Sequence, residues 1–103
     1  MSDARRAAIM LGVILIAAGA LFGIGYEMNV VGEGNAARDR MRRAGSSATP
    51  QQIASESYHM AHGEAAARTR WSLLGHGTLS VAAAVLGAGL IAFGVRAPGS
   101  RTT

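Results

Sequence analysis

Residues 68–96 read RTRWSLLGHGTLSVAAAVLGAGLIAFGVR, and this stretch decides the fold class. Between Ser72 and Val95 it contains no Asp, Glu, Lys or Arg. At ~1.5 Å of rise per residue, a helix of this length spans the ~30 Å hydrocarbon layer of a bilayer. The stretch therefore predicts a transmembrane helix over residues 72–95, with arginines beyond both of its ends.

A second uncharged run, AAIMLGVILIAAGALFGIG, fills residues 7–25 and follows a polar tail at residues 1–6. It predicts another transmembrane helix, over residues 7–26. Secretory signal peptides also place arginines before an apolar run, and residues 18–20 (Ala-Gly-Ala) match their cleavage sites. Because the apolar run continues beyond these residues to Ile24, we interpret it as an uncleaved membrane helix.

The segment between the two spans is polar. Residues 27–49 form the predicted extramembrane loop. Glycines and an asparagine predict that it begins with an irregular link, and the Arg-rich stretch AARDRMRRAG predicts a short helix within it. In TPQQ (residues 49–52), Thr is a good N-cap, Pro suits the first helical position and Gln can complete a capping box. A helix over residues 50–71 therefore begins here. No proline follows before Pro98, so we expect it to continue into the second membrane helix, with Gly63, Gly75 and Gly77 as weak points that would allow a bend near the membrane surface.

The predicted fold is an all-α membrane protein. Its two transmembrane helices form a helical hairpin, the second is extended by a long extramembrane helix, and a tail follows at residues 96–103. Aromatic and arginine side chains are typical of the membrane interface, and four of them lie on the loop side: Tyr26, Arg68, Arg70 and Trp71.

Small residues predict how the helices pack. In lipid, such residues allow close backbone approach, and the candidate packing positions are Gly19, Gly23, Gly75, Ala82 and Gly89. An apolar edge also repeats in sevens along residues 53–95, as expected for a helix that packs on a partner. These patterns indicate contacts within the hairpin or with another subunit, which includes a homo-oligomer.

Arginines give two answers for the orientation. All ten basic residues are Arg, which suggests codon bias. The loop holds more of them, whereas the tails hold them at higher density. Near the helix ends the two sides hold about equal numbers of arginines, and on the higher density in the tails we expect both termini on the cytoplasmic side of a bacterial inner membrane.

Composition and motifs exclude several classes. The arginines are divided among two tails and a loop, so they form no stripe for nucleic acid. Without cysteine the chain has no thiolate site. There is no phosphate loop, Ser/His/Asp set or paired membrane carboxylate, so we expect no enzyme activity and no catalytic residue.

Three histidines are the candidate ligands. His59 and His62 share one helix face and could hold a metal ion, although zinc needs three or four ligands. His76 lies inside the predicted membrane helix between two glycines, where an ionisable residue is a functional candidate. His62 and His76 lie fourteen positions apart in the sequence, which is the spacing of paired haem ligands in b-type cytochrome helices. Haem or (bacterio)chlorophyll are the cofactors to consider at His76.

The absence of a complete site, together with glycine-lined helices, favours one function. We expect a non-catalytic accessory subunit of a larger bioenergetic or photosynthetic membrane complex, in contact with lipid and other integral membrane proteins. One alternative is a small membrane protein that binds a tetrapyrrole or metal through its histidines. Another is a holin-like homo-oligomer that forms pores.

Overall fold

The computed structural model describes residues 2–96, and every regular element in that range is helical. The first helix, α1, spans Asp3–Tyr26 and passes through a π-helical segment, Glu27–Val31, into α2, Gly32–Ala44. A short 3-10 turn at Gly45–Ser47 leads to α3, Pro50–Arg68, and α4 spans His76–Arg96. The expected tail after Arg96 lies outside the described residues.

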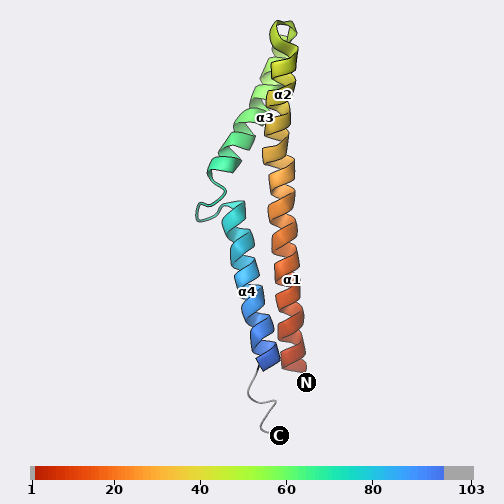
Figure 1. Cartoon of the computed structure of the whole chain (residues 1–103), viewed down its shortest axis with the longest axis vertical. Coiled ribbons are helices and arrows are strands. Elements are labelled where there is room, and N and C mark those ends of the chain that lie inside the picture. Colours follow the sequence, from red (N-terminus) through yellow and green to blue (C-terminus); the bar gives the residue numbers. More distant parts are fainter. Residues whose placement is uncertain (1, 97–103) are drawn as a thin grey trace.

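The helices form a narrow rod of 76 × 20 × 16 Å. Residues 3–47 make one continuous helix, and the other two helices lie end to end beside it (Figure 1). α4 packs antiparallel on α1, while α3 packs on α2 and the π-helical segment. We call α1 and α4 the lower pair, and α2 and α3 the upper pair.

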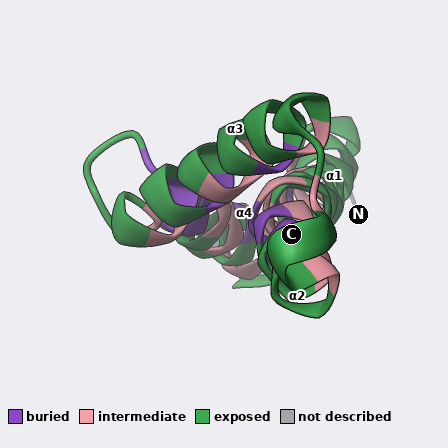
Figure 2. Ribbon diagram, turned by 90° about the horizontal axis from the view of Figure 1, so that it is seen from above, coloured by how far each residue is buried: buried purple, intermediate pink, exposed green. Residues whose placement is uncertain are grey.

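The lower pair has the character expected of membrane spans. Both of its helices are long and apolar enough to cross a bilayer, since 24 and 21 residues give ~36 and ~32 Å of helix. Large apolar side chains of both helices are exposed, among them Leu21 of α1 at 74% and Val85 of α4 at 65%. In the end-on view of Figure 2 the upper pair lies in front, and α3 is mostly exposed. The all-helical class predicted from the sequence, with two such helices, is therefore present.

The sequence predicted an irregular link after Tyr26, but the chain stays helical beyond the end of α1. The Gly32 N–H donates to the Glu27 carbonyl, so backbone hydrogen bonding continues through the π-helical segment. The predicted link after it is helical because Gly34 serves a packing role: an added Cβ there would lie 2.8 Å from the Gly63 Cα of α3. The turn comes at Gly45, whose φ of 56° favours glycine.

The second predicted helix is not continuous. α3 begins at Pro50 with Thr49 as N-cap, whose Oγ1 accepts a hydrogen bond from the Gln52 N–H at 3.1 Å. It ends at Arg68, however, and residues 69–75 form a tight turn before α4. The expected helix over residues 50–95 is therefore wrong in this respect, and its seven-residue apolar edge is broken at the turn.

Gly75 makes this turn possible. A Cβ at Gly75 would overlap the Thr69 carbonyl oxygen, so no other residue fits without displacing the backbone. The chain is then held by the Arg70 carbonyl oxygen, which accepts hydrogen bonds from the Gly77 and Thr78 amides at 3.0 and 3.2 Å. These bonds supply partners for donors in the first turn of α4, which a helix cannot satisfy internally.

Glycines bring the lower pair into backbone contact. A Cβ built on Gly87 would lie 2.5 Å from the Gly12 carbonyl oxygen, and one on Gly19 would lie 2.7 Å from the Ala83 Cβ. The Ser80 hydroxyl donates to the Gly19 carbonyl at 2.7 Å. Such contacts are the usual way for helices to associate in lipid.

The five predicted packing positions divide into three groups. Gly19 and Gly23 of α1 lie on the contact with α4, where a Cβ at Gly23 would overlap the Ser80 hydroxyl. Gly75 belongs to the turn. Ala82 and Gly89 are exposed, and nothing lies within 4 Å of a Cβ on Gly89, so they are not part of the hairpin contact.

Candidate functional site at the junction of the helix pairs

Three polar side chains from distant parts of the chain meet where the lower pair joins the upper pair. Glu27 opens the π-helical segment, Arg70 lies in the turn, and His76 begins α4. Arg70 donates from Nε and Nη2 to the two carboxylate oxygens of Glu27, at 2.8 and 2.5 Å. The His76 Nε2 lies 2.8 Å from Glu27 Oε1. We call this set the junction cluster.

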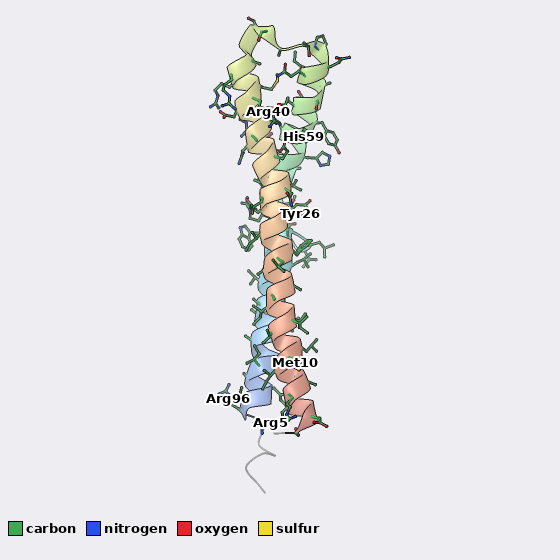
Figure 3. The ribbon with its side chains drawn as sticks, turned by 90° about the vertical axis from the view of Figure 1, so that its right-hand side faces the viewer. Arg5, Met10, Tyr26, Arg40, His59 and Arg96 are labelled. Carbon is green, nitrogen blue, oxygen red and sulfur yellow. The ribbon has the colours of Figure 1, made fainter. Side chains whose placement is uncertain are left out.

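His76 is enclosed on several sides. It is only 6% exposed, and the Tyr26 ring stacks on its imidazole with 4.6 Å between centroids. Because Tyr26 and Glu27 are adjacent in sequence, one turn of helix supplies both the stacking partner and the carboxylate. Figure 3 places Tyr26 about midway along the rod, with Arg5 and Arg96 at one end and Arg40 and His59 in the upper pair.

The cluster strongly favours the ionised carboxylate. The bidentate hydrogen bonds from Arg70, helped by His76, lower the pKa of Glu27 from 4.5 to about 2. The same contact raises the pKa of the Arg70 guanidinium above its ordinary value. Fork-to-fork pairing of this kind fixes orientation as well as charge, so the cluster holds the turn against the long helix.

The geometry at His76 bears on cofactor binding. Histidine commonly ligates metals through Nε2, and here that atom is hydrogen-bonded to Glu27. A haem iron or chlorophyll magnesium would have to use Nδ1 or displace the carboxylate. The cluster therefore forms a structural contact between the turn and the long helix, in which the His76 Nε2 is already hydrogen-bonded.

His59 and His62 lie on α3 beside the π-helical segment and α2. With Tyr58, Asn29, Val30 and Glu33 they line a small hollow of about 150 Å³. The Tyr58 ring lies 4.3 Å from that of His62 and 5.6 Å from that of His59. Within residues 2–96, no group of three or more His, Cys, Asp or Glu is placed to hold a metal ion. The two histidines therefore form an aromatic cluster with Tyr58.

A second ion-pair set connects the two helices of the upper pair. Arg40 of α2 donates from Nε and Nη2 to the carboxylate of Glu56 on α3, and from Nη2 to Glu33 at 2.7 Å. Glu56 is buried. The guanidinium beside it holds the pKa of Glu56 below its ordinary value. This set fixes the register of α3 on α2.

The predicted interface residues take different positions. Arg70 turns inward to Glu27, whereas Arg68 is exposed at the end of α3. Trp71 is 66% exposed, and in the same turn Leu73 and Leu74 are 85% and 79% exposed. This turn therefore presents one aromatic and two aliphatic side chains outward, close to the level of Tyr26.

A groove runs between α1 and α4 directly beside the junction cluster. Its volume is about 460 Å³, and its walls are apolar except near Glu27, Arg70, His76 and Ser80. Small residues, including Ala20, Gly23 and Ala84, form part of its lining.

Sequence reasoning did not find Glu27 or the pairing of Arg40 with Glu56. The available signal for Glu27 was an acidic residue directly after an apolar run, with an arginine directly before the next one. Periodicity on a single helix cannot show that residues 43 positions apart meet.

Comparison with known proteins adds no relative: no family model, no curated protein sequence and no solved structure matches this chain.

Proposed function

We propose that this chain is a non-catalytic subunit of a larger integral-membrane assembly, in which the upper pair is a docking arm for other membrane proteins. The lower pair inserts as a transmembrane hairpin. The junction cluster, at the membrane boundary, fixes the arm to the hairpin. Trp71, Leu73 and Leu74 enter the interfacial layer on the loop side, where aromatic residues are enriched.

The observation that carries the proposal is the small core of the arm. The buried hydrophobic residues in the described part of the chain are Val31, Ala37 and Ala66, all in the upper pair and its π-helical segment. Units of this size have marginal cores and usually depend on disulfides, metals or association. The chain has no cysteine, and Tyr58 and Ile53 of α3 remain exposed. A protein partner would cover them.

The arm's surface suggests where the partner binds. Tyr58 and His62 form an exposed aromatic cluster one helical turn apart on α3. Tyrosine is enriched among the residues that dominate binding energy at protein interfaces. We therefore place the contact on this face of α3.

Extraction in mild detergent with a tag on the chain tests the proposal. The wild type is expected to carry other membrane proteins with it, and the double variant Tyr58→Ala/His62→Ala to recover at least about tenfold less, since such a residue commonly contributes ~2 kcal/mol or more. Ser57→Ala, at a neighbouring exposed position, is the matched control. A wild-type chain that emerges without any other protein contradicts the proposal.

The arginine positions support an orientation with both termini in the cytoplasm of a bacterium. Arg5, Arg6 and Arg96 cluster at the end of the lower pair, whereas on the loop side Arg70 forms an ion pair with Glu27. The positive-inside rule counts basic residues near the membrane ends. Because the chain lacks cysteine, single cysteines at Ser2 and Ser57 can be labelled with an impermeant maleimide. Labelling of Ser2→Cys from outside intact cells would contradict this orientation and indicate the opposite one.

A further inference from the structure

The groove beside the junction cluster has the length of one membrane leaflet. Its lining begins at Ile16 of α1 and reaches Glu27 at the start of the π-helical segment, and along α4 it extends from His76 to Ala84. The eleven residue steps from Ile16 to Glu27 correspond to ~16 Å, about half of the ~30 Å hydrocarbon layer. The groove therefore starts at the membrane boundary and reaches about the middle of the bilayer.

The lining changes character along this length. Ala20 and Ala84 leave space between the helices in the lower part, while Trp71 and Met28 line it with larger side chains. The charged groups Glu27, Arg70 and His76 lie at its upper end, whereas the Ser80 hydroxyl lies further down and is already bonded to the Gly19 carbonyl. A volume of about 460 Å³ lies within the ~300–1,000 Å³ of ligand sites. The accessible wall of the groove is almost entirely apolar, so it suits an apolar chain, and the polar head of such a ligand would lie outside the groove at the boundary.

Arg70 offers a contact for that head. Its Nε and Nη2 atoms are occupied by Glu27, but Nη1 has no hydrogen-bond partner within residues 2–96. Guanidinium N–H groups are strong donors to phosphate oxygens. Arg68, exposed at the end of α3, adds a second positive charge on the same side of the membrane.

We propose that this groove binds one phospholipid of the loop-side leaflet, with an acyl chain lying between α1 and α4 and its phosphate beside Arg70. The bound lipid fills space that the two helices leave open and connects the turn at residues 69–75 to the bilayer. This inference rests on the membrane insertion proposed above, but not on the docking partner.

Lipid retention by the purified full-length chain tests the site. The protein is exchanged into detergent with phosphatidylglycerol, washed, and analysed by native mass spectrometry for bound lipid. In the variant Ala20→Leu/Ala84→Leu, larger side chains fill the groove. In the control Ala17→Leu/Ala88→Leu, the same substitutions fall on exposed positions of α1 and α4 outside it. Diacylglycerol, which has the same chains without phosphate, probes the contact with Arg70.

We expect the wild type and the control to retain phosphatidylglycerol equally and the groove variant to retain about tenfold less, a loss of ~1.4 kcal/mol. The wild type should also retain diacylglycerol less well than phosphatidylglycerol. Equal retention by all three proteins, or equal retention of the two lipids, overturns the proposal. A chain that carbonate extraction releases from membranes overturns the proposed function instead, so the two failures are distinguishable.

Discussion

Both the lower and the upper helix pair pack through glycine contacts, but different side-chain interactions connect the helices of each pair. In both, glycines meet across the contact: Gly12 with Gly87 in the lower pair and Gly34 with Gly63 in the upper pair. Within the lower pair, the described side-chain hydrogen bonds between helices end on backbone carbonyls, as in Arg5 to Gly94 and Ser80 to Gly19. The upper pair instead contains the ion pair of Arg40 with the buried Glu56.

This difference follows from the solvent expected around each pair. A charge in the hydrocarbon layer is costly, so backbone contact between small residues has to provide most of the association there. An aqueous helix pair can use paired charges to set its register, although such pairs contribute modestly to stability. The junction cluster lies between the two pairs, at the proposed membrane boundary, where both rules apply.

Gly87→Leu should cause the largest loss. Its Cβ would lie 2.5 Å from the Gly12 carbonyl oxygen, a backbone atom that cannot rotate away, so α1 and α4 must separate. Overpacking costs about 1–3 kcal/mol or more, measurable by steric trapping in bicelles. Gly89→Leu, two residues along on the exposed face, is the control and should change stability by less than about 0.5 kcal/mol. Equal effects would show that α4 does not pack in this register.

Gly63→Ala should have a smaller effect in the upper pair. A Cβ there would lie 2.8 Å from the Gly34 Cα, but the gain of ~0.5–1 kcal/mol in helix propensity offsets part of the overpacking. We expect a net loss of about 1 kcal/mol, seen as faster amide exchange in α3. If exchange slowed, the two helices would not be in contact at this glycine.

Glu27→Gln removes the negative charge of the junction cluster while keeping the shape of the side chain. Because Glu27 is partly exposed, solvent reduces the expected loss to about 1 kcal/mol. Release of the turn should appear as increased protease cleavage within residues 69–75. Glu64→Gln, at an exposed position on α3, should leave cleavage unchanged.

Acid should release the same turn over a defined pH range. The pKa of Glu27 is lowered from 4.5 to about 2 in the folded chain, so its contribution is fully present above pH 4.5 and is lost as pH falls toward 2. Fluorescence of Trp71, the only tryptophan, follows the turn. The difference between wild type and Glu27→Gln isolates this group from Glu56, whose pKa is also lowered. A difference that does not diminish over this range would contradict the assignment.

Arg5→Lys should produce the smallest effect. Arg5 donates from Nε and Nη2 to the carbonyls of Gly94 and Val95, at 2.7 and 2.9 Å, and the single ammonium of a lysine lacks this fork of separated donors. We expect a loss of about 0.5–1 kcal/mol, confined to amide exchange in the last turn of α4. Arg6→Lys, at the adjacent exposed position, should have no effect.

The sequence predicted the helical class and both apolar spans because hydrophobic length is a local property. It also located the start of α3 through the Thr49 cap. It predicted the wrong helix to be continuous. A helix through Gly34 is favoured by the close contact of this glycine with Gly63, and the break after Arg68 is favoured by the close packing of Gly75 on the Thr69 carbonyl. Both are tertiary contacts.

Two stripes of small residues repeat in sevens on the second apolar span, and only one of them packs within the hairpin. Gly75, Ala82 and Gly89 repeat in sevens, but so do Ser80, Gly87 and Gly94, and the latter set faces α1. Composition alone cannot choose between two such stripes. The same limit applies to the candidate site, where His76 was singled out by its position but its partner Glu27 was not.

The most direct test of the central proposal is the mass of the particle that carries the wild-type chain out of its native membrane in a polymer nanodisc. The proposed subunit role predicts a particle that contains other membrane proteins and is therefore heavier than this 10.6 kDa chain with lipid alone. A particle containing only copies of this chain and lipid would contradict it.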